Sequence, residues 1–273
     1  MTQAGWRTGL KRWAAACACA ALAGCTQLGA HAGAQAGAAA QAGALSADSR
    51  LRLAQTAESG GNRGLAVSMY AAAAAAAPGD AALAARCAEG AGRNGDLAAA
   101  EAILTGGLRA NPDAPDLMRG LGILSLVAGR AETALGQFER VLARDPADLR
   151  ALVDKGVALD MAGRHDEAQV LYAHALAASP DDAAARNDMG LSLMLQGRLR
   201  EAEAMLSPLG RAPAPPERAK VNLAVLLAAR GDRADAERLV GDGAPMGAVA
   251  DLARAVPHAA AGAADGAADG AAD

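Results

Sequence analysis

The sequence predicts an all-α fold: a superhelical solenoid of about six helix-turn-helix units, closed by a short C-terminal helix. The first observation is the 34-residue spacing of Pro112, Pro146 and Pro180. The second is composition. The 273-residue chain is 52% hydrophobic but only 2% aromatic, and its apolar residues are mostly alanine, which favours closely packed helices over a sheet core. The third is a glycine that recurs at the same 34-residue period, as Gly61, Gly95, Gly129, Gly163, Gly197 and Gly231.

The six units begin at residues 47, 81, 115, 149, 183 and 217, and each position is numbered from the first residue of its unit. The recurrent glycine occupies position 15, where a helix ends and the chain turns, often through positive φ. Positions 8 and 20 hold only glycine or alanine, which lets two helices pack closely. The proline at position 32, replaced by Ala214 in the fifth unit, ends the second helix because it has no N–H to donate. Position 24 holds Tyr70, Phe138 and Tyr172.

Small residues at positions 8 and 20, an aromatic at 24 and a proline at 32 of a 34-residue period resemble the tetratricopeptide (TPR) repeat. The resemblance implies a superhelix in which the first helix of each unit lines a concave face. It also implies that positions 2, 5, 9, 12 and 13 point into a groove. Residues 47–256 are predicted to form this array, with a closing helix over residues 246–256 that covers its last apolar face.

Residues 1–24 are predicted to be a lipoprotein signal peptide. Three basic residues precede an apolar run over residues 13–23, which is too short to span a bilayer. The run ends in Leu-Ala-Gly-Cys25, which resembles the bacterial lipobox, and the resemblance implies that Cys25 is acylated and becomes the new N-terminus. The alternative is an ordinary secretory signal that contains cysteines. The basic residues are Arg7, Lys11 and Arg12.

The acylated cysteine and an uncharged Ala/Gly-rich segment, residues 25–46, are predicted to form a flexible tether. The resemblance to bacterial lipoproteins implies that Thr26, directly after the cysteine, favours the outer membrane. The expected location is therefore the outer membrane, with a lipid anchor and the repeats facing the periplasm. The tail over residues 257–273 is predicted to be disordered.

The sequence offers little for catalysis. His165 and His174 lie nine residues apart without a carboxylate or cysteine that completes a ligand set, so no metal site is expected. The chain contains no Gly-x-Ser-x-Gly, and Gly120-Leu-Gly122 opens no Gly-x-Gly-x-x-Gly and follows no predicted strand. Aspartates after the closing prolines, such as Asp181 and Asp182, are interpreted as helix-start residues. A formal net charge of −4 and few aromatics argue against nucleic acid. We expect a non-catalytic protein without cofactor or small-molecule substrate.

Two residues at position 7 stand out. Cys87 occupies a core position and is predicted to be a small buried hydrophobe rather than a reactive thiol. Lys155 breaks the apolar pattern at that position. Its side chain is predicted to reach along apolar surface to solvent, and the alternative is a partner contact beside Asp154 and Asp188.

An apolar stripe along the predicted concave face is the candidate partner site. It suits an amphipathic helix or an extended apolar peptide, and the alternative is that part of it packs against neighbouring units or the tether. Positions 5 and 6 of units three to five hold a single basic residue, Arg119, which predicts a groove without the basic residues that chaperone-binding TPR domains use to bind a carboxylate. The predicted groove residues are Ile123, Leu126, Val127, Val157, Asp160, Met161, Leu191, Met194, Leu195 and Val225.

The run NDMGLSLMLQGRLREAEAMLSPL at residues 187–209 and the run KVNLAVLLA at 220–228 resemble the TPR lipoprotein of tight-adherence (Flp-type) pilus assembly systems. The lipobox, the tether and the closing helix are similar too. The resemblance implies an outer-membrane lipoprotein that helps the pilus secretin, or another pilus component, to assemble without catalysis. The alternative is a general periplasmic scaffold that recruits peptidoglycan or other envelope-biogenesis enzymes.

Overall fold

The computed structural model describes residues 45–241 and 246–257, and in that part it contains thirteen helices and no strand. The predicted all-α solenoid is therefore confirmed. The predictions for the signal peptide, for Cys25 and the tether up to residue 44, and for the tail after residue 257 lie outside the described residues. None of the helices within the described ranges is long and apolar enough to span a membrane.

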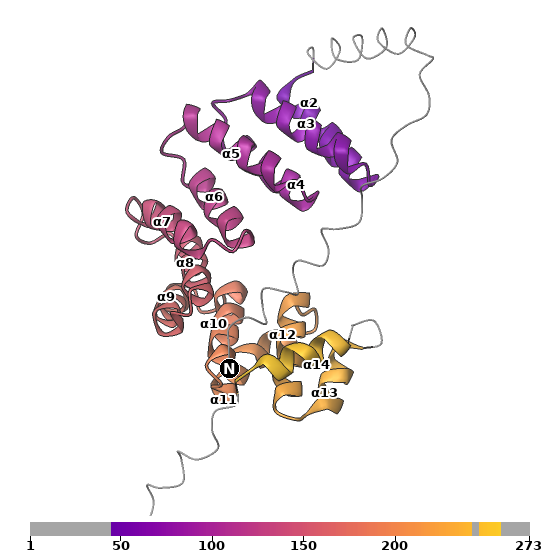
Figure 1. Ribbon diagram of the computed structural model, residues 1–273, viewed down its shortest axis with the longest axis vertical. Coiled ribbons are helices and arrows are strands. Elements are labelled where there is room, and N and C mark those ends of the chain that lie inside the picture. Colours follow the sequence, from indigo (N-terminus) through magenta and orange to yellow (C-terminus); the bar gives the residue numbers. More distant parts are fainter. Residues whose placement is uncertain (1–44, 242–245, 258–273) are drawn as a thin grey trace, which may run out of the picture. The chain divides into compact units, whose positions relative to one another are not determined.

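The helices form six antiparallel pairs in chain order, followed by one closing helix (Figure 1). The first helix of every pair occupies positions 1 to 13 of its unit. The first helices are α2 (Ala47–Ser59), α4 (Ala81–Arg93), α6 (Pro115–Val127), α8 (Leu149–Met161), α10 (Ala183–Leu195) and α12 (Glu217–Ala229). The second helices are α3 (Arg63–Ala76), α5 (Leu97–Ala110), α7 (Ala131–Leu142), α9 (His165–Ala178), α11 (Leu199–Gly210) and α13 (Arg233–Val240), and α14 (Met246–Ala255) follows.

The turn inside every pair passes through the recurrent glycine. All six glycines have φ between 71° and 93°, a left-handed conformation that costs glycine no steric strain. The residue after the glycine is the N-cap of the second helix, as Asn62 is for α3 and Asp96 for α5. The Asn62 side chain accepts a hydrogen bond from the Leu65 N–H at 3.2 Å, and Asp96 accepts one from the Ala99 N–H at 2.8 Å. These caps satisfy backbone donors that a helix start leaves unpaired.

Aspartates after the closing prolines begin the following first helix, as the sequence predicts for Asp182. Its carboxylate accepts hydrogen bonds from the N–H groups of Ala184 and Ala185, each at 2.9 Å. Asp148 caps the start of α8 in the same way, accepting from the Ala151 N–H at 3.0 Å. These carboxylates are therefore structural.

Each glycine at position 8 makes room for the large side chain at position 24 of its own unit. A Cβ atom added to Gly122 would lie 2.4 Å from Phe138 Cε1, and one added to Gly156 would lie 2.5 Å from Tyr172 Cε1. Both rings are fully buried. The two positions of the repeat pattern therefore describe one contact between the helices of a pair.

The alanine run from Ala71 to Ala77 continues the second helix of unit one. Helix α3 extends to Ala76 and buries Tyr70. The fifth unit is less regular. Helix α11 contains Pro208 and ends at Gly210, before the loop in which Ala214 replaces the expected proline.

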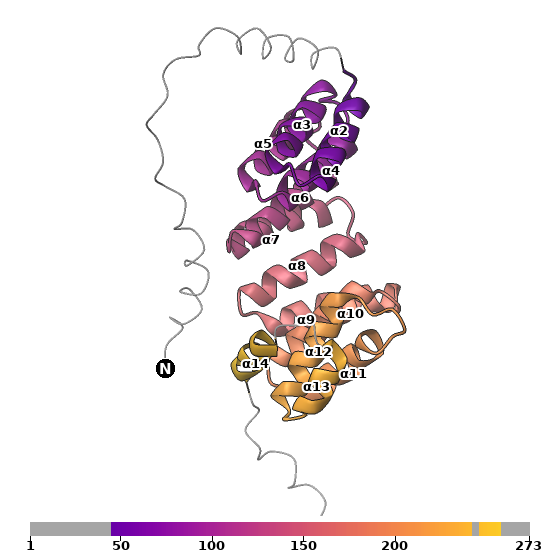
Figure 2. The same ribbon diagram turned by 90° about the vertical axis from the view of Figure 1, so that its right-hand side faces the viewer.

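The closing helix α14 covers the apolar face of α12 and α13, beside which Figure 2 shows it. Val249, Ala253 and Val256 are buried in one cluster with Leu226 and Val240. An array of repeats needs such a cover because its last unit has no following unit to pack against.

Replacing Gly156 with leucine is expected to lower the free energy of unfolding by about 1–3 kcal/mol, because the new side chain overpacks the contact with Tyr172. Urea unfolding followed by circular dichroism measures the change.

Gly136→Leu is the matched control. Gly136 lies on an exposed face of α7, and a Cβ atom there meets nothing within 4 Å. This variant is expected to match or exceed wild-type stability, since leucine favours a helix more than glycine does. Wild-type unfolding of Gly156→Leu would contradict the packing described here.

Candidate partner-binding groove

A groove of about 640 Å³ opens between α4 and α6, the first helices of units two and three. Small side chains of α4 form one wall, and large apolar side chains of α5 and α6 form the other. Arg150, at the start of α8, also lines it. The apolar lining includes Ala85, Ala88, Leu97, Leu104, Ile123 and Val127.

Two of the ten predicted groove residues line this groove. Ile123 and Val127 face it from α6, and 37% and 60% of their surfaces are exposed. Met161 is also exposed, on α8. Four further residues are half-buried along the first helices and do not line it. They are Leu126, Val157, Leu191 and Leu195.

The prediction that Met194 and Val225 line an open groove is wrong. Their exposed fractions are only 1% and 6%, and both belong to the core cluster of α10 to α14. Because α10 and α12 pack directly on each other, these side chains face the neighbouring unit. The alternative that part of the stripe packs between units holds for these two residues.

Four arginines line the groove, and only Arg119 lies at positions 5 and 6 of units three to five, the positions that the sequence analysis considered. The other three could not be assigned to the groove from those positions. Two of the four already hold carboxylates. Arg93 contacts both carboxylate oxygens of Glu58, at 3.0 and 3.1 Å, and Arg119 Nη1 lies 3.1 Å from Asp154 Oδ2. The four are Arg86, Arg93, Arg119 and Arg150.

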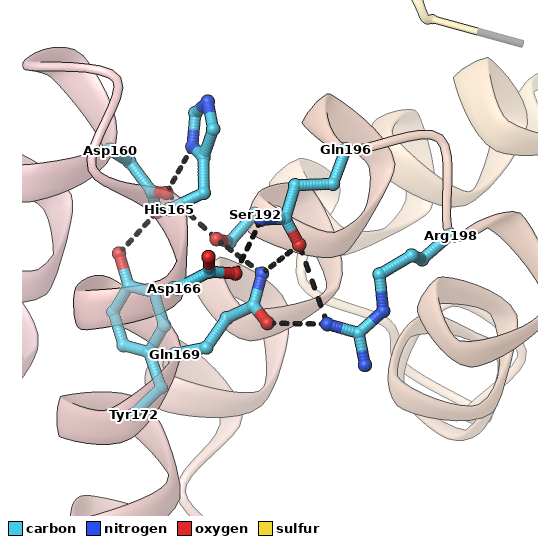
Figure 3. Close-up of polar contacts among 8 residues, drawn as sticks. All are labelled: Asp160, His165, Asp166, Gln169, Tyr172, Ser192, Gln196 and Arg198. Atoms are coloured by element: carbon cyan, nitrogen blue, oxygen red, sulfur yellow. Dashed lines mark hydrogen bonds and ion pairs between the residues drawn. The ribbon is translucent and has the colours of Figure 1, made fainter. Parts of the chain in front are cut away.

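The carboxylate of Asp160 is engaged by three neighbouring side chains (Figure 3). The Tyr172 hydroxyl donates to Oδ2 at 2.9 Å, and the Ser192 hydroxyl donates to Oδ1 at 2.7 Å. His165 Nδ1 lies 2.7 Å from Oδ1. Since Ser192 belongs to α10, the carboxylate joins units four and five. Asp160 therefore serves packing between units, and we exclude it from the proposed partner surface.

These residue types do not form a catalytic triad. A nucleophilic serine needs a histidine within hydrogen-bond reach of its hydroxyl, whereas the Asp160 carboxylate lies between His165 and Ser192. The other hydrogen bonds of the network involve the side-chain amides of Gln169 and Gln196. Gln169 Nε2 donates to Gln196 Oε1 at 2.9 Å, and Arg198 Nη1 donates to Gln169 Oε1 at 2.7 Å.

An acid at position 12 accompanies a tyrosine at position 24. The Tyr70 hydroxyl donates to Glu58 as the Tyr172 hydroxyl donates to Asp160. Where position 24 holds Phe138, which has no hydroxyl, position 12 holds Leu126. This pairing was visible in the sequence, and it would have identified Asp160 as structural.

Burial and these contacts change the acid–base behaviour of the tyrosines. Burial, and next the Asp160 carboxylate, raises the pKa of Tyr172 well above its usual range. The pKa of Tyr70 is raised by burial and by its bond to Glu58. The pKa of Glu58 is lowered, first by the hydrogen bond from Arg93 and then by that from Tyr70. Glu58 therefore favours its charged form.

Cys87 and Lys155 behave as predicted. Cys87 is fully buried, and burial raises the pKa of its thiol to about 11, which keeps it protonated and unreactive. The Lys155 side chain reaches solvent, where Nζ lies 3.0 Å from Glu139 Oε1. Glu139 belongs to α7, in the preceding unit, so this ion pair joins units three and four. Within residues 45–241 and 246–257, no group of three or more histidine, cysteine or carboxylate side chains is placed to hold a metal ion.

The tetratricopeptide-repeat family model matches residues 91–156 and 159–218. These residues therefore form tetratricopeptide repeats, and the described helices have the fold of a TPR solenoid. Such arrays are scaffolds that bind other proteins, and no catalytic family is indicated for this TPR protein. Among proteins of curated function, none has a significantly similar sequence.

Solved structures share the fold. A TPR protein from Parabacteroides merdae is 16% identical with a TM-score of 0.63, covering 76% of this chain and 84% of its own. PilW, described as a widely conserved type IV pilus biogenesis factor, is 19% identical with a TM-score of 0.60, covering 75% and 96%. PilF from Pseudomonas aeruginosa is 15% identical with a TM-score of 0.53, covering 71% and 88%. At these identities the likeness extends to the fold alone.

Tyr172→Phe is expected to lower the free energy of unfolding by about 1–3 kcal/mol, because Asp160 loses a buried donor. Urea unfolding measures this loss.

The pairing can also be built into unit three, which serves as the control. Phe138→Tyr and Leu126→Asp should each lower the free energy of unfolding. The double variant should lose about 1.5–3 kcal/mol less than the sum of the two single losses. Strict additivity would argue against the pairing.

Glu58→Gln is expected to cost about 0.2–1 kcal/mol at pH 7, because the ion pair with Arg93 is partly exposed. The lowered pKa fixes the pH dependence: the contribution of Glu58 is present above its ordinary pKa of 4.5 and is lost as pH falls through the lowered value. Urea unfolding at pH 7 and near pH 3.5 should therefore show the difference from wild type shrinking in acid.

Glu89→Gln is the control, since Glu89 has no ion pair or hydrogen bond within the part of the chain that the structure describes. It should lack this pH-dependent difference. A constant deficit of Glu58→Gln at both pH values would argue against a charge effect.

Proposed function

We propose that this TPR protein is an outer-membrane lipoprotein that acts as a non-catalytic assembly factor for a Flp-type pilus. It binds the secretin, or another pilus component, through the groove between α4 and α6. The groove is the observation that carries the proposal. Three exposed large apolar side chains line it together: Leu97, Ile123 and Val127. Exposed apolar patches of this kind mark protein-binding surfaces.

The pilus assignment draws support from two sources. The sequence of the later units resembles the TPR lipoproteins of tight-adherence systems, and PilW, a type IV pilus biogenesis factor, shares the fold over 75% of this chain. A protein of this class needs to be held near the channel that it helps to assemble. The lipobox at Cys25 and the uncharged segment after it, with a reach of about 25 Å if flexible, would supply that position.

A deletion strain complemented with variants tests the proposal. Deletion should abolish surface pili while the pilin is still made, and wild type should restore them. Val127→Asp should fail to restore pili, because it places a charge in the groove. Its control is Val170→Asp, which charges an equally apolar side chain, 68% exposed, on α9 away from that groove.

Cys25→Ser should move the protein from the membrane fraction to the soluble periplasmic fraction and reduce piliation. Unchanged fractionation would contradict the lipid anchor. Normal pili in the deletion strain, with altered cell shape or lysis instead, would favour a general scaffold for peptidoglycan enzymes.

A further inference from the structure

Polar bridges link consecutive first helices at four of the five junctions between units. Arg93 of α4 binds Glu58 of α2, and Arg119 of α6 binds Asp154 of α8. Ser192 of α10 donates to Asp160 of α8. Two bridges join α10 and α12. Asn222 Nδ2 lies 2.9 Å from Asn187 Oδ1, and Arg218 pairs with Asp188.

The junction of α4 and α6 is the exception. Within the described ranges, no hydrogen bond or ion pair joins these two helices. The units meet instead through apolar contacts, such as Gly120 against Leu104 and Gly107 against Leu117, and α4 and α6 still pack against each other. The groove opens at this junction, and the polar side chains of α4 and α6 that line it form no bond from one of these two helices to the other.

The charged residues around the groove have a positive surplus. Its lining contains four arginines and two acids, 4 − 2 = +2, in a chain whose formal net charge is −4. Arg93 and Arg119 are already paired. Arg86, on α4, and Arg150, on α8, are both exposed, and neither side chain forms an ion pair or hydrogen bond with a described residue. The two acids, Glu89 and Asp116, are likewise exposed and without such a bond.

We propose that the α4–α6 groove binds a segment of another protein that combines bulky apolar side chains with carboxylates. The apolar side chains would enter beside Ile123 and Val127, and Arg86 and Arg150 would bind the carboxylates. This inference rests on the proposed function, whose binding surface it narrows to one junction and one partner chemistry. Apolar burial supplies the affinity, and the arginines select an acidic over a basic segment.

Two synthetic 16-residue helical peptides with the same leucine stripe test this, one with glutamates and one with lysines on the polar face. Fluorescence anisotropy with the purified full chain in detergent measures their affinities. The glutamate peptide should bind at least about 10-fold more tightly at low salt, and the ratio should fall as salt screens the exposed charges.

Variants of the full chain separate the contribution of the arginines to peptide affinity from that of the apolar side chains. Arg86→Gln and Arg150→Gln should each weaken the glutamate peptide about 2- to 5-fold, as expected for exposed ion pairs. Glu89→Gln, the matched control, removes an opposing charge and should leave binding unchanged or tighter. Val127→Asp should abolish binding, whereas Val170→Asp should not.

Several outcomes would overturn the proposal. These are no binding of either peptide, equal affinity for both, or binding that Val127→Asp leaves intact. If the glutamate peptide bound only after removal of residues 258–273, the occupant would be the acidic tail of this chain rather than another protein. Failure of the proposed function is distinguishable, because normal pili in a deletion strain would remove the pilus role while peptide binding stayed as predicted.

Discussion

The fit of a large side chain against a glycine backbone holds together the helix pairs of units three to five of this TPR protein. At Gly122 and Gly156 an added Cβ would meet the ring of Phe138 or Tyr172 at 2.4–2.5 Å, a distance that no rotamer change of a buried ring relieves. The angle between paired helices follows from this contact. The positive-φ glycine at each turn lets the chain reverse, so that the second helix runs antiparallel to the first. With both fixed, successive pairs stack and present their first helices on one face.

On that face, polar bridges join consecutive first helices at four of the five junctions between units. Each bridge depends on two side chains about 35 residues apart, as in Arg119 with Asp154 and Asn187 with Asn222. At the junction of α4 and α6, which has no such bridge, the side chains of the two helices line the groove. The array can therefore differ in surface chemistry from one junction to the next while the repeated backbone stays the same.

Much of the fold could be predicted from the sequence, because its determinants are local. The glycine at position 15 and the small residue at position 8 recur in every unit, and Asp182 caps its own helix. The site could be predicted only in part. Ile123 and Val127 were found, but Met194 and Val225 were mistaken for groove residues, since periodicity cannot tell a side chain facing a neighbouring unit from one facing solvent. Arg86 and Arg150 come together only when units two and four are placed in space.

Photocrosslinking in cells tests the central claim most directly. A photoreactive phenylalanine at Val127, in the groove, is compared with one at Val170, an exposed apolar residue away from it. If the α4–α6 groove is the docking surface, the Val127 probe will form one discrete protein adduct that the Val170 probe does not. Adducts from Val170 alone, or the same adducts from both positions, would contradict the account.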